Sequence, residues 1–205
     1  MPSLLSPIVQ QLINALPVAE HSITVDAAFW QPKFVAAGQE ALWAVIFAGL
    51  PSIRISRNRL LTFAYQTPEQ KCAEVFLWGY PTDMRGLISR LLPDLTALSG
   101  HAVSAAPWPD YYNAFPAGIG ISTITKIAYF HGRNFGGLNA LILDQRLIDN
   151  TANWFEVVLP GLSYANARKR YLDYLQVMHA AAANPRLVCA PDQLEFFLFA
   201  LGDSF

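Results

Sequence analysis

The sequence has few charges, and it lacks a long apolar run. Charged residues make up 14% of the 205 residues, against about 25% in an ordinary soluble domain. Because 53% of the residues are hydrophobic, much of the chain must be interior, which excludes a disordered protein. The best candidate for a membrane span, Ala41–Leu50, is about ten residues long and ends at Pro51. A span needs roughly 18 apolar residues, so we expect no membrane association.

Cysteines are also scarce. The two that are present, Cys72 and Cys189, lie far apart and form no set of metal ligands. The sequence contains no iron–sulfur cysteine set, phosphate-binding P-loop or dinucleotide fingerprint, so we expect no cofactor. Residues Met1–Leu16 lack the basic region and the small-residue cleavage site of a signal peptide. These features predict a cytoplasmic protein with reduced thiols.

The chain has no overall basic field, since its net charge is −1. Basic residues nevertheless cluster within Arg54–Arg59 and within Arg168–Arg170. A local basic patch for nucleic acid can coexist with a neutral total. Each cluster can equally be a set of solvated charges on a loop or a helix.

The pattern of apolar residues and helix-ending residues predicts an all-α protein, folded as a single compact domain over residues 1–205. Ser122 and Asp192 are predicted to cap two of the helices. Ser52–Arg57 could form a short strand, and Leu141–Leu143 is ambiguous. The predicted helices are Ala36–Leu50, Thr67–Gly79, Asp83–Pro93, Trp108–Phe115, Thr123–His131, Tyr164–Ala183 and Gln193–Leu201, with a turn or short helix at Trp154–Leu159.

Two glycines, Gly118 and Gly120, stand two residues apart just before a predicted helix. Without Cβ atoms, such a turn can present its backbone N–H groups outward. Together with a helix N-terminus these groups would form an anion site, and a DNA phosphate is a natural anion. The alternative is an ordinary turn between two helices.

A single acid, Asp144, interrupts the aliphatic stretch Leu141–Ile148. A carboxylate in apolar surroundings is costly to bury unless it has a partner or a role. The alternative is that Asp144 caps the helix that follows Leu143. The two interpretations are compatible.

The order of these features resembles one known family. A short helix, the hairpin Pro116–Gly120, a second helix, a glycine-containing loop and an aliphatic stretch with an aspartate resemble the helix-hairpin-helix superfamily of base-excision DNA glycosylases. Within it, the chain is most similar to the 8-oxoguanine-DNA-glycosylase-like bacterial branch. The resemblance covers Trp108–Ile148, with the hairpin motif at about 108–131, and extends to Gln193–Gly202, where the family closes its base pocket. It implies helical lobes around a DNA-binding cleft and, we expect, a monomer that acts on double-stranded or modified DNA.

The resemblance also implies roles for individual residues. Asp144 matches the catalytic aspartate, while Gly118, Gly120 and the amides up to Ser122 would hold a DNA phosphate. Arg146 falls where the family often has a phosphate-contacting side chain. A flipped base needs an aromatic pocket and a wedge for the gap that it leaves. Candidates for these parts are Trp78, Tyr80, Gln193 and Phe197, and for each of them core packing is the alternative.

The family carries a lysine near the hairpin in enzymes that also cleave the strand. If Gly118–Gly120 is the hairpin, Ser122 occupies that position, and Lys126 lies one turn further on the same face. If Gly120–Ser122 is the hairpin, Ile124 occupies it, and Lys126 is about 200° round the helix. Neither register places a lysine there, so we expect a monofunctional glycosylase, with Lys126 as a reserve nucleophile or a phosphate ligand.

Other functions stay open at this point. The chain could be a bifunctional glycosylase/lyase that uses Lys126 as a Schiff-base nucleophile. It could also be a non-catalytic hairpin module that binds DNA, or a helical protein-interaction domain. Oxidised guanine is the substrate that the family implies by default. Relatives on the bacterial branch are also associated with anti-phage defence, which implies a bulkier modified base as an alternative.

Overall fold

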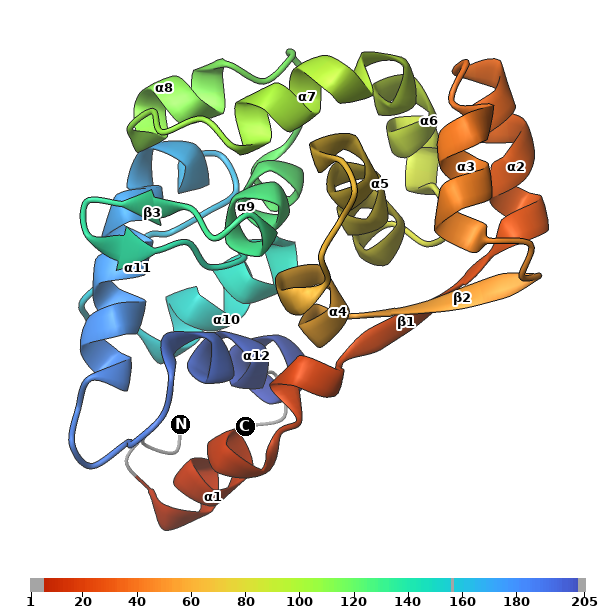
Figure 1. The fold of residues 1–205 in the computed structure, drawn as a ribbon. Coiled ribbons are helices and arrows are strands. Elements are labelled where there is room, and N and C mark those ends of the chain that lie inside the picture. The colour runs from red at the N-terminus through yellow and green to blue at the C-terminus, as the bar shows by residue number, and fades with distance from the viewer. Residues whose placement is uncertain (1–5, 156, 203–205) are drawn as a thin grey trace. The chain divides into compact units, whose positions relative to one another are not determined.

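The computed structural model describes residues 6–155 and 157–202. The protein is mostly helical, as expected, with two small antiparallel sheets that the sequence did not fully predict. The chain forms two compact units (Figure 1): unit 1 is built from the chain up to Val18 and from Ala105 onward, and unit 2 is Ala19–Ser104. The expectation of a single domain stays a prediction. Within the described ranges no helix is both long and apolar enough to cross a membrane.

Unit 2 is built around one buried helix, α5, which packs against α7 and strand β1. Thr67 caps α5 by accepting a hydrogen bond from the Gln70 amide, and Pro68 is in its first turn, so this predicted helix is confirmed. The elements of unit 2 are β1 (Ser22–Asp26), α2 (Ala27–Ala36), α3 (Glu40–Phe47), β2 (Ser52–Ser56), α4 (Arg57–Thr62), α5 (Pro68–Gly79), the 3-10 turns Met84–Gly86 and Leu92–Asp94, α6 (Leu87–Leu91) and α7 (Leu95–Ala102), preceded by a 3-10 turn at Val18–Glu20.

Two predictions for unit 2 were wrong in detail. The helix expected at Ala36–Leu50 is the shorter helix α3, Glu40–Phe47, because α2 ends at Ala36 and a turn with Gly38 at a φ of +70° separates the two. The helix expected at Asp83–Pro93 is interrupted by 3-10 turns. The strand suggested at Ser52–Arg57 is confirmed as β2, and it pairs with β1 in the register Ser22↔Ser56. Strand β1 was not predicted, although Ile23 and Val25 alternate with polar residues in it as Ile53 and Ile55 do in β2.

Unit 1 surrounds helix α9, which is buried along almost its whole length. In Figure 1, α12 lies between α1 and α10, and it also packs against α11. The elements of unit 1 are α1 (Pro7–Ala15), α8 (Trp108–Asn113), α9 (Ile121–Phe130), β3 (Asn134–Phe135), β4 (Leu138–Asn139), α10 (Gln145–Trp154), α11 (Ala167–Ala182) and α12 (Pro191–Leu201).

Two predicted helix caps in unit 1 were wrong. Helix α9 starts two residues earlier than the hydroxyl of Ser122 suggested: its N-cap is Gly120, and Ser122 lies inside the first turn. Helix α12 starts at Pro191, so Asp192 is helical, and its carboxylate accepts a hydrogen bond from Tyr129 Oη at 3.1 Å. A residue that is able to cap does so only where the backbone is still extended, and the chain becomes helical before it reaches either residue.

Candidate functional site

The hairpin between α8 and α9 depends on the glycine at position 118. The Ile119 amide donates to the carbonyl of Pro116 at 3.3 Å, which closes the turn. Gly118 has a φ of +91°, a conformation that residues with a Cβ rarely adopt. Gly120 has an ordinary φ, and a Cβ atom there would displace only the hydroxyl end of the exposed Tyr164 side chain. The chain therefore reaches the first turn of α9 through a turn that a residue other than glycine would strain at position 118.

Asp144 is the N-cap of α10. Its Oδ1 accepts a hydrogen bond from the Leu147 amide at 3.0 Å, so the capping role foreseen for this residue is realised. Its Oδ2 lies 3.9 Å from the Nζ of Lys126. One carboxylate oxygen is thus engaged by the helix, and the other faces a cation. The Asp144 side chain keeps 19% of its surface exposed, so it can still meet another molecule.

Lys126 lies beside Asp144, and its side chain is the more deeply buried of the two. Its Nζ donates to Ser122 Oγ at 2.6 Å, one helical turn earlier. Ile124, by contrast, is fully buried. Ser122 and Lys126 are four residues apart, so they share a face of α9 in either register, and the register of the hairpin stays a prediction. Since only 10% of the lysine side chain is exposed, salt in the solvent screens its attraction to Asp144 only weakly.

The segment that leads into Asp144 is extended and buried, and side chains bind its peptide groups. The Leu143 amide donates to Thr125 Oγ1 at 3.0 Å. The Ile142 amide donates to Glu195 Oε2 at 3.0 Å, and its carbonyl accepts from Tyr174 Oη at 2.9 Å. Tyr171 Oη accepts from the Leu141 amide and donates to the Leu141 carbonyl. Burial raises the pKa of Tyr171 well above its ordinary value, so this phenol stays protonated and able to donate.

Comparison with known proteins decides the family. A family model described as "Putative 8-oxoguanine DNA glycosylase OGG-like protein" matches residues 16–199. The chain belongs to this OGG-like family. The family resemblance proposed from the hairpin and Asp144 is thus confirmed, and membership implies an enzyme that acts on DNA. Neither the curated proteins nor the solved structures include a match.

In this OGG-like protein, the three other candidates from unit 1 lie on α10 and α12. Arg146 is exposed, two residues beyond Asp144, with its guanidinium 5.5 Å from the ring centre of Phe199. Gln193 Oε1 accepts a hydrogen bond from the Ala190 amide, which closes the first turn of α12. Phe197 is fully buried against Trp154. Gln193 and Phe197 thus have structural contacts here, and their role in reading a base stays a prediction.

The two aromatic candidates, Trp78 and Tyr80, belong to unit 2. Trp78 is buried, with the guanidinium of Arg57 5.6 Å from its ring centre and the ring of His21 packed edge-on against it. Tyr80 is half-buried at the end of α5. Only Tyr80 of this pair offers appreciable surface to a base.

A strained turn that the sequence did not single out follows Tyr80. Asp83 and Arg85 both have positive φ, +49° and +61°, although neither is glycine. The Asp83 carboxylate fixes the turn by accepting from the Ile88 amide at 2.7 Å and by pairing with Lys33 at 3.4 Å. Between the strained residues, Met84 is 63% exposed. Non-glycine residues in this conformation are concentrated at functional sites, whereas the sequence offered only a generic turn signal.

The two basic clusters differ in their surroundings. In unit 2, Arg57 is buried, and Arg59 binds the buried carboxylate of Glu74 through two hydrogen bonds of 2.7 and 2.8 Å. In unit 1, Arg168 lies at the surface, where its guanidinium stacks over Tyr112 with 4.4 Å to the ring centre. In the first cluster Arg57 and Arg59 therefore stabilise the fold while Arg54 is exposed, and the second cluster offers charge to solvent.

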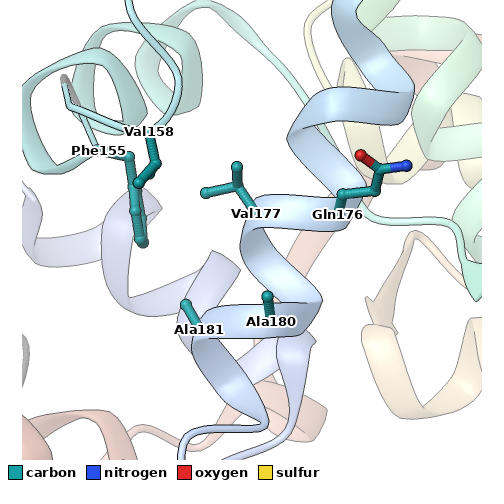
Figure 2. Close-up of a pocket in the computed structure, with 6 residues that line it drawn as sticks. All are labelled: Phe155, Val158, Gln176, Val177, Ala180 and Ala181. Carbon is teal, nitrogen blue, oxygen red and sulfur yellow. The ribbon is translucent and has the colours of Figure 1, made fainter.

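An apolar pocket of about 530 Å³ opens between the end of α10 and the C-terminal half of α11. Figure 2 shows Val177 pointing toward Phe155 and Val158, while the amide of Gln176 points away. Among the described residues the lining has no ionisable side chain, and it is completed by Ala180 and Ala181. Phe155 and Asp144 flank opposite ends of α10, about 15 Å apart along a ten-residue helix. This pocket therefore does not contain the carboxylate.

Proposed function

We propose that the protein is a DNA glycosylase that hydrolyses the N-glycosidic bond of a modified base, with Asp144 as its catalytic residue. One observation carries the proposal: Asp144 has one oxygen fixed by the start of α10 and the other directed at Lys126, on a partly exposed side chain. The glycine hairpin that precedes α9 supports it, because a phosphate site beside the carboxylate would hold the nucleotide in place.

The chemistry requires few groups. The target nucleotide leaves the base stack, since its glycosidic bond is inaccessible inside a duplex. As the bond between the sugar C1′ and the base nitrogen breaks, its electron pair leaves with the base, and the sugar gains oxocarbenium character. The Asp144 carboxylate stabilises that positive charge. It then accepts a proton from the water whose oxygen attacks C1′, and the departing base takes up a proton.

We propose that the hairpin and the first turn of α10 bind the phosphates of the DNA backbone. The backbone amides at Gly118, Gly120 and Ser122 would meet a phosphate, where the N-terminal dipole of α9 favours negative charge. Arg146, exposed on the first turn of α10, would add a charge-assisted contact to a neighbouring phosphate.

Met84 is our candidate for the apolar wedge that enters an unstacked duplex. An apolar wedge inserted between base steps stabilises an unstacked duplex. Trp78 was one candidate for this role, but it is buried, whereas Met84 is exposed on a turn with little backbone freedom. Tyr80 remains our candidate for stacking on the base.

We propose a monofunctional enzyme, because the family's lysine position holds Ser122 or Ile124 in the two possible registers. One observation favours a bifunctional glycosylase/lyase as the second candidate: the Lys126 amine lies 3.9 Å from Asp144, within reach of a sugar that contacts the carboxylate. Oxidised guanine is the base that membership of the family favours. Mass spectrometry of the free bases released from oxidised DNA and from modified phage DNA would test it against a bulkier target.

The decisive variant is Asp144→Asn. Asparagine still accepts the Leu147 hydrogen bond and caps the helix, but it can neither stabilise a cation nor take a proton. We expect single-turnover base release to fall by at least about 100-fold, with the affinity for the same duplex changed less than about threefold. Asp149→Asn, on the exposed face of the same helix, is the matched control and should behave as the wild type. Unchanged base release in the Asp144 variant would remove the proposed mechanism. A wild-type protein that binds DNA but releases no base would instead indicate a binding module.

A further inference from the structure

The residues Leu141–Leu143 form an extended, buried segment, yet they pair with no strand in the part of the chain that the structure describes. A buried backbone without hydrogen bonds is costly. Here side chains from α9, α11 and α12 make the hydrogen bonds that a neighbouring strand would otherwise make. Asp144 follows immediately, so this segment sets the position from which its carboxylate projects.

Polar side chains such as those that bind this segment stabilise a core no better than apolar side chains often do. Glu195 is fully buried, and burying a carboxylate is unfavourable before its hydrogen bonds are counted. Apolar side chains of similar volume often stabilise a core at least as well. The carboxylate and the tyrosine hydroxyls therefore indicate a demand for a defined backbone position, since each hydrogen bond fixes one peptide group.

Thr125 connects this segment to the site. Its hydroxyl donates to the Ile121 carbonyl at 2.9 Å and accepts from the Leu143 amide at 3.0 Å. The next residue, Lys126, contacts the carboxylate of Asp144. Helix α9 thus holds both the peptide group just before Asp144 and the carboxylate itself.

We propose that Thr125, together with Glu195 and Tyr174, is a positioning residue for Asp144, acting through the backbone of Leu141–Leu143. This inference rests on the proposed glycosylase function. Displacement of a reacting group by about 1 Å can slow an enzyme roughly 100-fold. Loss of the Thr125 hydroxyl releases the Leu143 amide from α9 and lets the carboxylate move relative to the sugar.

The test compares Thr125→Val, which keeps the shape and removes the hydroxyl, with Thr125→Ser, which keeps the hydroxyl. We expect the valine variant to lower the rate of single-turnover base release by about 10- to 100-fold, with DNA affinity unchanged. The serine variant should retain most of the wild-type rate.

Thr151→Val is the matched control. Thr151 is buried in α10, and its hydroxyl has no hydrogen-bond partner among the described residues, so its loss should leave the rate unchanged. Glu195→Gln, which keeps an acceptor for the Ile142 amide, should retain more activity than Glu195→Met.

A double variant separates positioning from general destabilisation. In the Asp144→Asn background, Thr125→Val should cause no further loss of residual base release, because the group that it positions is no longer there. A further loss of similar size there, or a wild-type rate for the single Thr125→Val variant, would overturn the inference. Failure of the proposed function looks different, since the wild type and Asp144→Asn would then be equally inert. In that case amide hydrogen exchange at Leu143, faster in Thr125→Val, would reduce Thr125 to a purely structural role.

Discussion

Lys126 lies beside Asp144, and its two possible roles require different protonation states of its amine. A lysine can attack a sugar only as a neutral amine, whereas the contact with Asp144 and the hydrogen bond to Ser122 both suit an ammonium. In the bound enzyme the ammonium can orient the carboxylate and attract the DNA backbone without forming a covalent bond. This arrangement gives the pair a function in a monofunctional enzyme.

Borohydride trapping on substrate DNA tests this directly. We expect no covalent protein–DNA adduct with the wild type, and we expect Lys126→Ala to slow base release by about 3- to 10-fold, since one charge contact of about 1 kcal/mol is lost. Lys71→Ala is the control, because burial lowers the pKa of Lys71 and so favours its neutral amine, although Lys71 lies in unit 2. An adduct formed by the wild type and absent from Lys126→Ala would establish the lyase mechanism instead.

At the scale of an element, the turn at Asp83–Gly86 combines rigidity with exposure. Two non-glycine residues at positive φ cost on the order of 1–3 kcal/mol each, and the contacts of Asp83 with Ile88, Ser89 and Lys33 oppose that strain. The exposed Met84 side chain is therefore carried by a backbone that already has a fixed conformation. Its insertion into DNA would cost little conformational entropy.

Met84→Ala should therefore affect base extrusion more than protein stability. We expect base release to fall by about tenfold, from the loss of wedge contacts of about 1–2 kcal/mol, with a change in unfolding free energy below about 0.5 kcal/mol. The fluorescence of 2-aminopurine beside the target base reports unstacking, and its increase on binding should shrink. Val103→Ala removes a comparably exposed apolar side chain from the same unit and should leave the fluorescence unchanged. An equal effect of the two variants would rule out Met84 as the wedge.

Sequence reasoning succeeded for elements whose signals are local. Helix α5 was predicted because Thr67 and Pro68 are sufficient to start a helix, and Asp144 was identified because its neighbours are aliphatic. The caps at Ser122 and Asp192 failed, since the preceding Gly120 and Ala190 already had the extended backbone of an N-cap. The hydrogen bonds of Leu141–Leu143 could not have been foreseen, because they join residues 18 to 53 positions apart in the chain.

At the scale of the whole molecule, DNA binding must depend on the local arrangement of charge, because the net charge is −1. Exposed cations such as Arg146 and Arg168 would contribute individual phosphate contacts. Every phosphate neutralised adds about 0.9 to the slope of log affinity against log salt.

With at least two such contacts, we expect duplex affinity to fall by about tenfold or more between 50 and 200 mM salt. Fluorescence anisotropy on a labelled duplex measures this, and Arg146→Gln should reduce the slope by about one contact. Arg59→Gln is unsuitable as a control, because Arg59 binds the buried Glu74. Arg186→Gln serves instead, since Arg186 is exposed and lies outside both basic clusters. An affinity that is independent of salt would favour a protein-interaction domain over a DNA enzyme.

The insertion of unit 2 between two stretches of unit 1 has a consequence for how the protein is made. Helix α1 leaves the ribosome before residues 19–104, while its packing partner α12 leaves after them. Residues 19–104 are complete and able to collapse in the interval, since domains generally fold as units during translation. Helix α1 must wait with its buried face, Val9 and Ile13, uncovered. A nascent chain that stalls before residue 191 would therefore expose this apolar face, and we expect it to be bound there by chaperones.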